Sequence, residues 1–223
     1  MGVLTIVRHG QASFGTDDYD RLSDLGIKQS AALGQSWEAG GTVFTHAIAG
    51  AMKRHAQTAI TAIDASGLGE EDADPGLSGY DVDAGWNEYD HLAIARALDP
   101  AGESRDMKSF QVLLNQALDR WIAQKAADAP GESYVDFRDR VMAALTASLD
   151  LAGRGQSVVV FSSGGPIAMV VSHLLAGDDS LFQRLNDVVI NASTTTIING
   201  STGPRLLAFN EHTHLPTSLV TYR

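Results

Sequence analysis

The sequence predicts an α/β fold, a three-layer sandwich in which a mostly parallel sheet lies between helices. Short apolar runs without polar alternation recur along the chain, as is typical of strands buried on both faces. Segments with the apolar spacing of helices lie between these runs. The 223 residues, 44% of them hydrophobic and 19% charged, suffice for one substantial core. We therefore expect one domain over residues 1–223, with a helical lid inserted at about residues 75–153.

The strands come first. Val3–Val7, Thr45–Ala49 and Ser157–Phe161 are apolar on consecutive positions, which favours burial on both faces of a parallel sheet. Thr194–Ile198 and Arg205–Phe209 alternate more, and the Asn-Gly pair between them is typical of a tight turn. These last two strands are expected to pair at an edge of the sheet.

The helices follow from caps and spacing. Ser23 can cap a helix that ends near Gly40-Gly41, and Met52–Ala65 is a second helix. Pro166 is expected at the first position of a helix that continues over Ile167–Leu175, because the first turn tolerates proline. The inserted lid shows two runs with helical spacing: Phe110, Leu113, Leu114, Ala117, Leu118 and Trp121, then Phe137, Val141, Leu145 and Leu149.

Composition excludes several classes of protein. With 16 Lys+Arg against 27 Asp+Glu the formal charge is −11, which argues against binding to nucleic acid or to an anionic membrane. The absence of cysteine removes disulfides, thiolate metal sites and cysteine nucleophiles. The segment Glu211–His214 lacks further ligands at fixed spacing, so no metal site is predicted. The first residues have no basic region of a signal peptide, and no apolar run approaches the ~20 residues of a membrane span. We expect a soluble, cytoplasmic protein.

Polar residues follow three of the predicted strands. Arg8 and His9 follow the first strand, Lys53 and Arg54 come shortly after the second, and the turn Ser162–Pro166 follows the third. Ligands of open α/β sheets bind beyond the carboxyl ends of the strands, and the amides at a helix N-terminus can face an anion. Two arginines, a histidine and a helix N-terminus should therefore form a positive, phosphate-sized pocket that contains a nucleophile.

The same residues carry a family resemblance. Residues 4–11, which contain Arg-His-Gly, resemble the signature of the histidine phosphatase superfamily, the phosphoglycerate mutase-like proteins. Residues 19–29, 51–59, 86–88 and 162–166 resemble, in the expected order, the segment after the signature, the second-arginine helix, the acidic segment and the final glycine motif.

The resemblance implies roles for single residues. His9 would be the nucleophile that becomes phosphohistidine, and Arg8 and Arg54 would hold the phosphoryl oxygens. Glu88 would be the general acid and base, with Glu70, Glu71, Asp81, Asp83 and Asp90 as rival carboxylates. Further phosphate contacts are expected from Gln11, Ser13, Ser163 and Gly164. Catalysis of phosphoryl transfer depends mainly on positioning the reacting groups and stabilising charge. The resemblance therefore implies neither a metal nor another cofactor.

One position departs from the pattern. Most relatives carry a second histidine before the two glycines, where this chain has Ser163. A hydroxyl can donate one hydrogen bond but brings no positive charge, and losing one preorganised donor costs roughly 100- to 1,000-fold in rate. His55 and His91 are candidates to compensate, although the sequence does not place either of them.

The predicted activity is metal-independent hydrolysis of a small phosphorylated substrate. The residues after the signature differ from those of mutases, which favours phosphatase over phosphoglycerate mutase. A catalytically weak phospho-ligand-binding protein is the alternative from another class, and a phosphohistidine-protein phosphatase is a further variant. The substrate and the oligomeric state stay open at this point.

Overall fold

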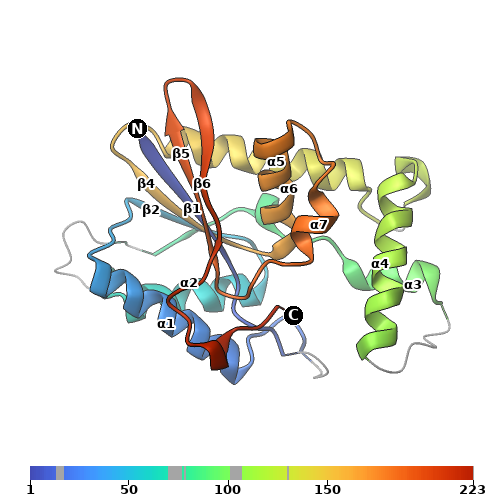
Figure 1. The fold of residues 1–223 in the computed structure, drawn as a ribbon, viewed down its shortest axis with the longest axis horizontal. Helices are drawn as coiled ribbons and strands as arrows, with labels where there is room; N and C mark the ends of the chain where they lie inside the picture. Colours follow the sequence, from blue (N-terminus) through green and yellow to red (C-terminus); the bar gives the residue numbers. More distant parts are fainter. Residues whose placement is uncertain (14–17, 70–76, 78, 101–106, 130, 223) are drawn as a thin grey trace. The chain divides into compact units, whose positions relative to one another are not determined.

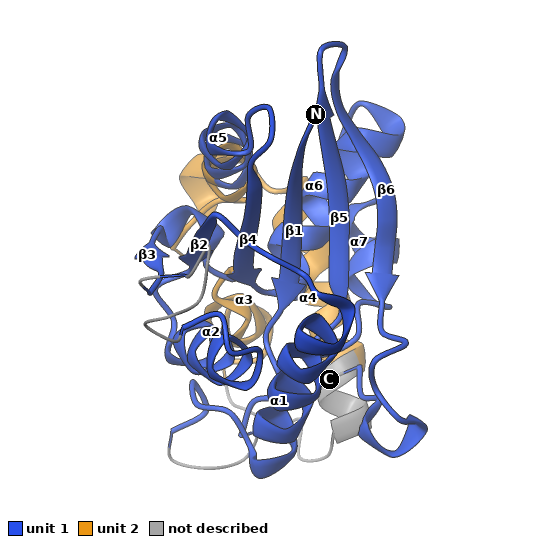
Figure 2. Ribbon diagram, turned by 90° about the vertical axis from the view of Figure 1, so that its left-hand side faces the viewer, with its two compact units in different colours: residues 1–88, 141–223 blue, residues 89–140 orange. Residues whose placement is uncertain are grey.

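The computed structural model describes residues 1–13, 18–69, 77, 79–100, 107–129 and 131–222, and, of residues 107–111, the backbone only. The rival carboxylates Glu70 and Glu71 and the side chain of Phe110 lie outside the described part. The chain divides into two compact units, Met1–Glu88 with Val141–Arg223, and Tyr89–Arg140 (Figure 2).

The larger unit contains one sheet, which has six strands in the described part of the chain, in the order β3-β2-β4-β1-β5-β6. The strands are β1 (Gly2–Arg8), β2 (His46–Ala49), β3 (Asp81–Val82), β4 (Ser157–Ser162), β5 (Thr194–Gly200) and β6 (Gly203–Glu211). Strands β3, β2, β4 and β1 run parallel to one another, whereas β5 is antiparallel to both β1 and β6. The predicted α/β fold with a mostly parallel sheet is confirmed.

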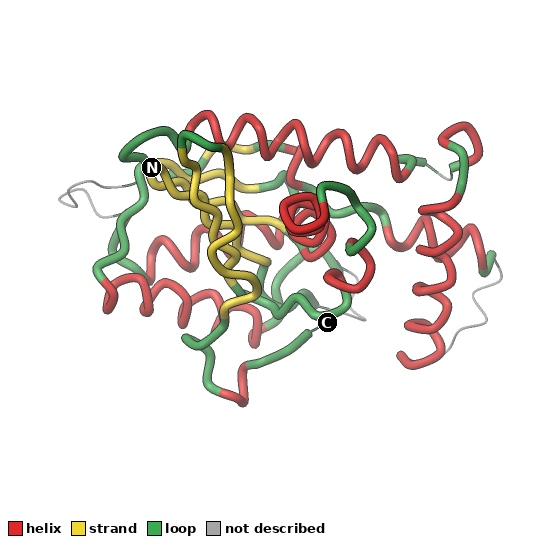
Figure 3. The backbone as a smooth tube through the Cα atoms, turned by 45° about the horizontal axis from the view of Figure 1, so that its top comes forward, coloured by secondary structure: helices red, strands yellow, loops and turns green. Residues whose placement is uncertain are grey.

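Helices cover both faces of this sheet (Figures 1 and 3). Helices α1 (Asp24–Gly40) and α2 (Lys53–Ala65) lie on one face. On the other lie α6 (Gly164–Ala176), α7 (Phe182–Asn186) and the second half of α5 (Tyr134–Leu151). The short helices η1 (Ala84–Trp86) and η3 (Thr217–Leu219) complete the unit.

Local signals set the ends of α1 as predicted. The Ser23 side chain accepts a hydrogen bond from the Gly26 amide at 3.1 Å, and Gly41 ends the helix with a left-handed backbone at φ 62°. The start of α6 differs from the prediction, because the helix begins at Gly164 and Pro166 is its third residue. Proline is tolerated there since the first amides of a helix have no carbonyl partner within it.

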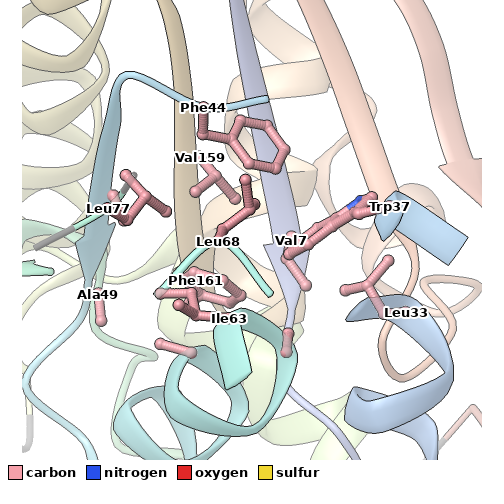
Figure 4. Close-up of a cluster of buried hydrophobic side chains, with 13 residues drawn as sticks. Val7, Leu33, Trp37, Phe44, Ala49, Ile63, Leu68, Leu77, Val159 and Phe161 are labelled. Carbon is pink, nitrogen blue, oxygen red and sulfur yellow. The ribbon is translucent and has the colours of Figure 1, made fainter. Parts of the chain in front are cut away.

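The core between the sheet and α1 and α2 follows from strand alternation. Val7, Val159 and Phe161 point to this face and meet Leu33 and Trp37 of α1 (Figure 4). The other strand positions, such as Leu4, Ile6, Val158 and Val160, are equally buried. Burial on both faces explains why these strands show no polar alternation and holds the carboxyl ends of β1 and β4 in place.

The smaller unit is helical in its described residues. It contains α3 (His91–Leu98), α4 (Met107–Ala123), η2 (Ala126–Asp128) and the first turns of α5. Its core is aromatic, with ring centroids of Trp121 lying 5.2 Å from Tyr89, 5.2 Å from Tyr134 and 5.6 Å from Phe137. The unit lies within the range of about 75–153 expected for the inserted lid, and the lid itself stays a prediction. In the described part of the chain, no helix has the length and apolar character needed to cross a membrane.

Candidate active site

The carboxyl ends of β1, β2 and β4 meet at one edge of the sheet. The register pairs Arg8 with Ser162 and Ala49 with Phe161. The chain beyond the strands stays paired, since the His9 amide donates to the Ser162 carbonyl at 2.8 Å. The residues that follow the three strands are therefore neighbours in space.

His9 is buried directly after β1, with both ring nitrogens engaged. Its Nδ1 lies 2.7 Å from the Gly10 carbonyl, which can only accept, so Nδ1 carries the proton. Its Nε2 accepts a hydrogen bond from Nε of Arg54 at 3.2 Å. Burial, with the charges of Arg54 and Arg8 next, holds the pKa of His9 well below its usual value. The ring is a neutral imidazole with its lone pair on Nε2.

Arg54 is fixed from three sides in the first turn of α2. Besides its bond to His9, its Nη1 forms an ion pair with Asp20 at 2.7 Å, and its guanidinium carbon lies 5.8 Å from the centroid of the Tyr19 ring. The side chain is almost fully buried, and a permanent charge so held is suited to binding an anion. In the sequence, Tyr19 and Asp20 stand out only as part of a motif. Nothing in the sequence indicates that both side chains contact Arg54.

Arg8 is the last residue of β1 and directly precedes His9. Its Nη1 donates to the carbonyls of Val189 and Tyr222, the latter at 2.7 Å. A Cβ atom at Gly164 would lie 3.7 Å from the guanidinium carbon of Arg8, so the side chain passes close to the first residue of α6. The positive end of this helix thereby adds to the charge of the guanidinium.

Glu88 reaches the same helix N-terminus. The partly buried side chain accepts a hydrogen bond through Oε2 from the Gly165 amide at 3.1 Å. The segment that carries it is anchored because Ser162 Oγ donates to the Trp86 carbonyl at 2.8 Å and Trp86 is fully buried. Glu88 is therefore held at the end of β4, close to α6.

The rival carboxylates within the described residues have other surroundings. Asp83 Oδ1 accepts from the Gly85 amide at 2.8 Å, and Asp90 Oδ1 accepts from the Ala93 amide at 2.9 Å as the N-cap of α3. Asp81 is exposed on β3.

An imidazole lies beside Ser163. The Ser163 hydroxyl is 2.7 Å from Nε2 of His55 on α2, both side chains are fully buried, and the His55 ring centroid is 5.7 Å from that of His9. Burial, together with the charge of Arg54, holds the pKa of His55 well below its usual value. Of the two histidines left open by the sequence, His55 is the one that the structure brings to His9 and Ser163.

Gln11 and Ser13 make their hydrogen bonds at the start of α1. Gln11 Oε1 accepts from Ser23 Oγ at 2.9 Å, and the Ser13 hydroxyl donates to the Leu22 carbonyl at 2.9 Å. These bonds fasten the segment after the signature to the helix cap.

Residue 191 was not singled out from the sequence. Asn191 Nδ2 donates to the His9 carbonyl at 3.2 Å and so supports the turn that carries the histidine.

No group of three His, Asp or Glu side chains suited to a metal ion occurs within the described residues.

Comparison with known proteins identifies the family of this chain. The family described as the histidine phosphatase superfamily (branch 1) matches residues 4–212, and the chain belongs to this family. A comparison with curated proteins gave no match.

Three similar solved structures are enzymes that act on phosphate compounds. A mutant of phosphoserine phosphatase from Entamoeba histolytica, in complex with phosphoserine, is 18% identical over 97% of this chain and 100% of its own, with a TM-score of 0.63. Phosphoglycerate mutase from Bacillus anthracis is 17% identical over 96% and 94%, with a TM-score of 0.66. Mycobacterial glucosyl-3-phosphoglycerate phosphatase is 23% identical over 95% and 100%, with a TM-score of 0.62. At these identities the likeness establishes the fold.

Proposed function

We propose that this protein is a phosphatase that hydrolyses small phosphomonoesters through a phosphohistidine intermediate at Nε2 of His9. The observation that carries the proposal is the 2.7 Å contact between Nδ1 of His9 and the Gly10 carbonyl. The Gly10 carbonyl holds the proton on Nδ1, and burial beside two arginines keeps the imidazole neutral, so Nε2 presents a lone pair without the help of a base.

The positive groups around His9 are suited to the phosphoryl oxygens. The Nε–H of Arg54 donates to Nε2 of His9, and the same Nε–H can donate to a phosphoryl oxygen instead when Nε2 attacks. Arg8 passes close to the first residue of α6, and together they supply further positive charge. Fixed charges of this kind stabilise a transition state that is mostly a matter of positioning and electrostatics.

Glu88 is suited to the proton transfers. In its protonated form it would give a proton to the leaving alkoxide oxygen as the new Nε2–P bond forms and the P–O bond breaks. As a carboxylate it would then take a proton from the water that attacks the phosphohistidine, releasing inorganic phosphate and restoring His9. Its bond to the Gly165 amide keeps it at the positive pocket while it changes state.

The test is turnover of 4-nitrophenyl phosphate between about pH 5 and 8, with a chelator present. His9→Ala is compared with His46→Ala, a control at the opposite end of β2 from the site. We expect turnover by the unmodified protein and by the control, and none by His9→Ala. Retention of more than a tenth of the activity in His9→Ala would overturn the proposal. Phosphate binding without turnover in the unmodified protein would favour a phospho-ligand-binding protein instead.

A further inference from the structure

The His55–Ser163 pair is a buried hydrogen bond beside His9 that the mechanism above does not use. Ser163 is the N-cap residue of α6, and a serine there ordinarily accepts a bond from the second or third helical amide. Here its side chain makes no such bond, and the second amide, that of Gly165, donates to Glu88. The Ser163 hydroxyl is thus diverted from capping the helix to His55.

The other ring nitrogen of His55 identifies the direction of this hydrogen bond. Nδ1 is buried and has no hydrogen-bond partner among the described residues. It faces the backbone of Gly50, where a Cβ atom would lie only 2.2 Å away. A buried N–H without an acceptor costs more than a lone pair that faces a C–H group. Since the ring is neutral and carries one proton, that proton belongs on Nε2.

This tautomer determines what Ser163 can do. A hydroxyl has one hydrogen and two lone pairs, and the Nε2–H of His55 fills one lone pair. The hydroxyl hydrogen is then left for another acceptor, and accepting one bond strengthens the bond that it donates. With the opposite tautomer, the Ser163 hydroxyl would donate its hydrogen to Nε2 of His55 and could not donate it to an anion.

We propose that His55 is a positioning residue that donates to Ser163 Oγ and thereby directs the Ser163 hydroxyl hydrogen onto the phosphoryl group at His9. The inference rests on the proposed function, because it assigns a donor to the same pocket. Its structural part, the tautomer and the binding of phosphate, does not depend on turnover. The pair supplies a neutral donor oriented by an imidazole from α2, with Gly50 leaving the space that the ring needs.

The first experiment observes the tautomer in the unmodified, full-length protein. Long-range ¹H–¹⁵N correlation spectra of ¹⁵N-histidine-labelled protein at pH 7 distinguish a protonated Nε2 from a protonated Nδ1, and His55→Gln assigns the signals by their loss. We expect the proton on Nε2. A proton on Nδ1 would overturn the inference, whatever the fate of the variants.

The second experiment measures the binding of inorganic phosphate by calorimetry. We expect Ser163→Ala to weaken binding roughly tenfold to a hundredfold, as for loss of a hydrogen bond to a charged group. His55→Leu should weaken it by about tenfold, and adding His55→Leu to Ser163→Ala should cost little more, because both act through one donor. His55→Gln, whose amide can still donate to Ser163, should bind within about threefold of the unmodified protein.

These outcomes separate the inference from the proposed function. Unchanged phosphate binding in His55→Leu, or no rescue by His55→Gln, would overturn the role of His55 even if His9 is the nucleophile. Turnover that survives in His9→Ala would overturn the proposed function and leave the tautomer result standing.

Discussion

Acidification from pH 7.5 to 5.5 should destabilise this protein through its two buried histidines in the pocket, His9 and His55. Burial, and then neighbouring arginine charge, holds the pKa of each well below its usual value in the folded state. In the unfolded chain each titrates near 6.5. The unfolded state therefore binds more protons below that pH, and the free energy of unfolding falls as the pH falls from about 6.5 toward the folded-state pKa.

The magnitude follows from linkage. A histidine that stays neutral in the folded state throughout this window contributes about 1.4 kcal/mol of lost stability between pH 7.5 and 5.5. Two such groups give an upper limit of about 2.7 kcal/mol, a large share of the 5–15 kcal/mol typical of a folded domain. Burial also lowers the pKa of His214, which adds to the same trend, so the test needs a difference between variants.

The assay is urea-induced unfolding at pH 7.5, 6.5 and 5.5. The unmodified protein should lose up to about 2.7 kcal/mol more over this range than the double variant His9→Gln/His55→Gln, and each single variant should remove about half of the difference. His212→Gln, a histidine outside the pocket, is the control. An identical pH dependence in the unmodified protein and the double variant would refute the claim that both rings are buried in their neutral form.

Three further substitutions test the site and its support. Arg54→Lys keeps the positive charge but loses the Nε–H that donates to His9. In steady-state assays, kcat/KM for 4-nitrophenyl phosphate should fall by at least about 100-fold, and a loss under threefold would contradict this role. Glu88→Gln should lower kcat/KM about 100-fold or more for an alkyl phosphate. The loss should be far smaller for 4-nitrophenyl phosphate, because its leaving group needs no proton. Equal losses for the two substrates would count against Glu88 as the general acid. Gly26→Ala would place a Cβ atom 2.2 Å from the Gln11 carbonyl oxygen and should cost roughly 1–3 kcal/mol in urea unfolding, whereas an unchanged midpoint would show that the backbone yields easily.

Much of the fold could be predicted because the signals are local. The strands β1 and β4 are apolar runs buried on both faces, and α1 carries its own start and stop signals in Ser23 and Gly41. Strand β3 has two exposed residues and no periodicity, so no pattern could reveal it. The antiparallel pairing of β5 with β1 likewise depends on a long-range choice that neither segment encodes.

The candidate site divides in the same way. His9, Arg8 and Arg54 could be found because each lies at or shortly after the carboxyl end of a strand, and parallel strands bring these ends together. The bond between His55 and Ser163 joins residues 108 positions apart, from the first turn of α2 to the N-cap of α6. Which of several histidines reaches residue 163 is a matter of three-dimensional packing, and the sequence contains no local sign of it.

The central claim is that the phosphoryl group passes through Nε2 of His9. It is tested most directly by mixing the protein with a phosphomonoester, quenching in alkali within one turnover, and locating the bound phosphoryl group by peptide mass spectrometry and ³¹P NMR. The account predicts a phosphohistidine at His9 with the phosphorus on Nε2, present in the unmodified protein and absent in His9→Ala. Steady turnover with no phosphoenzyme, or with the phosphoryl group on Nδ1 or on another residue, would contradict it.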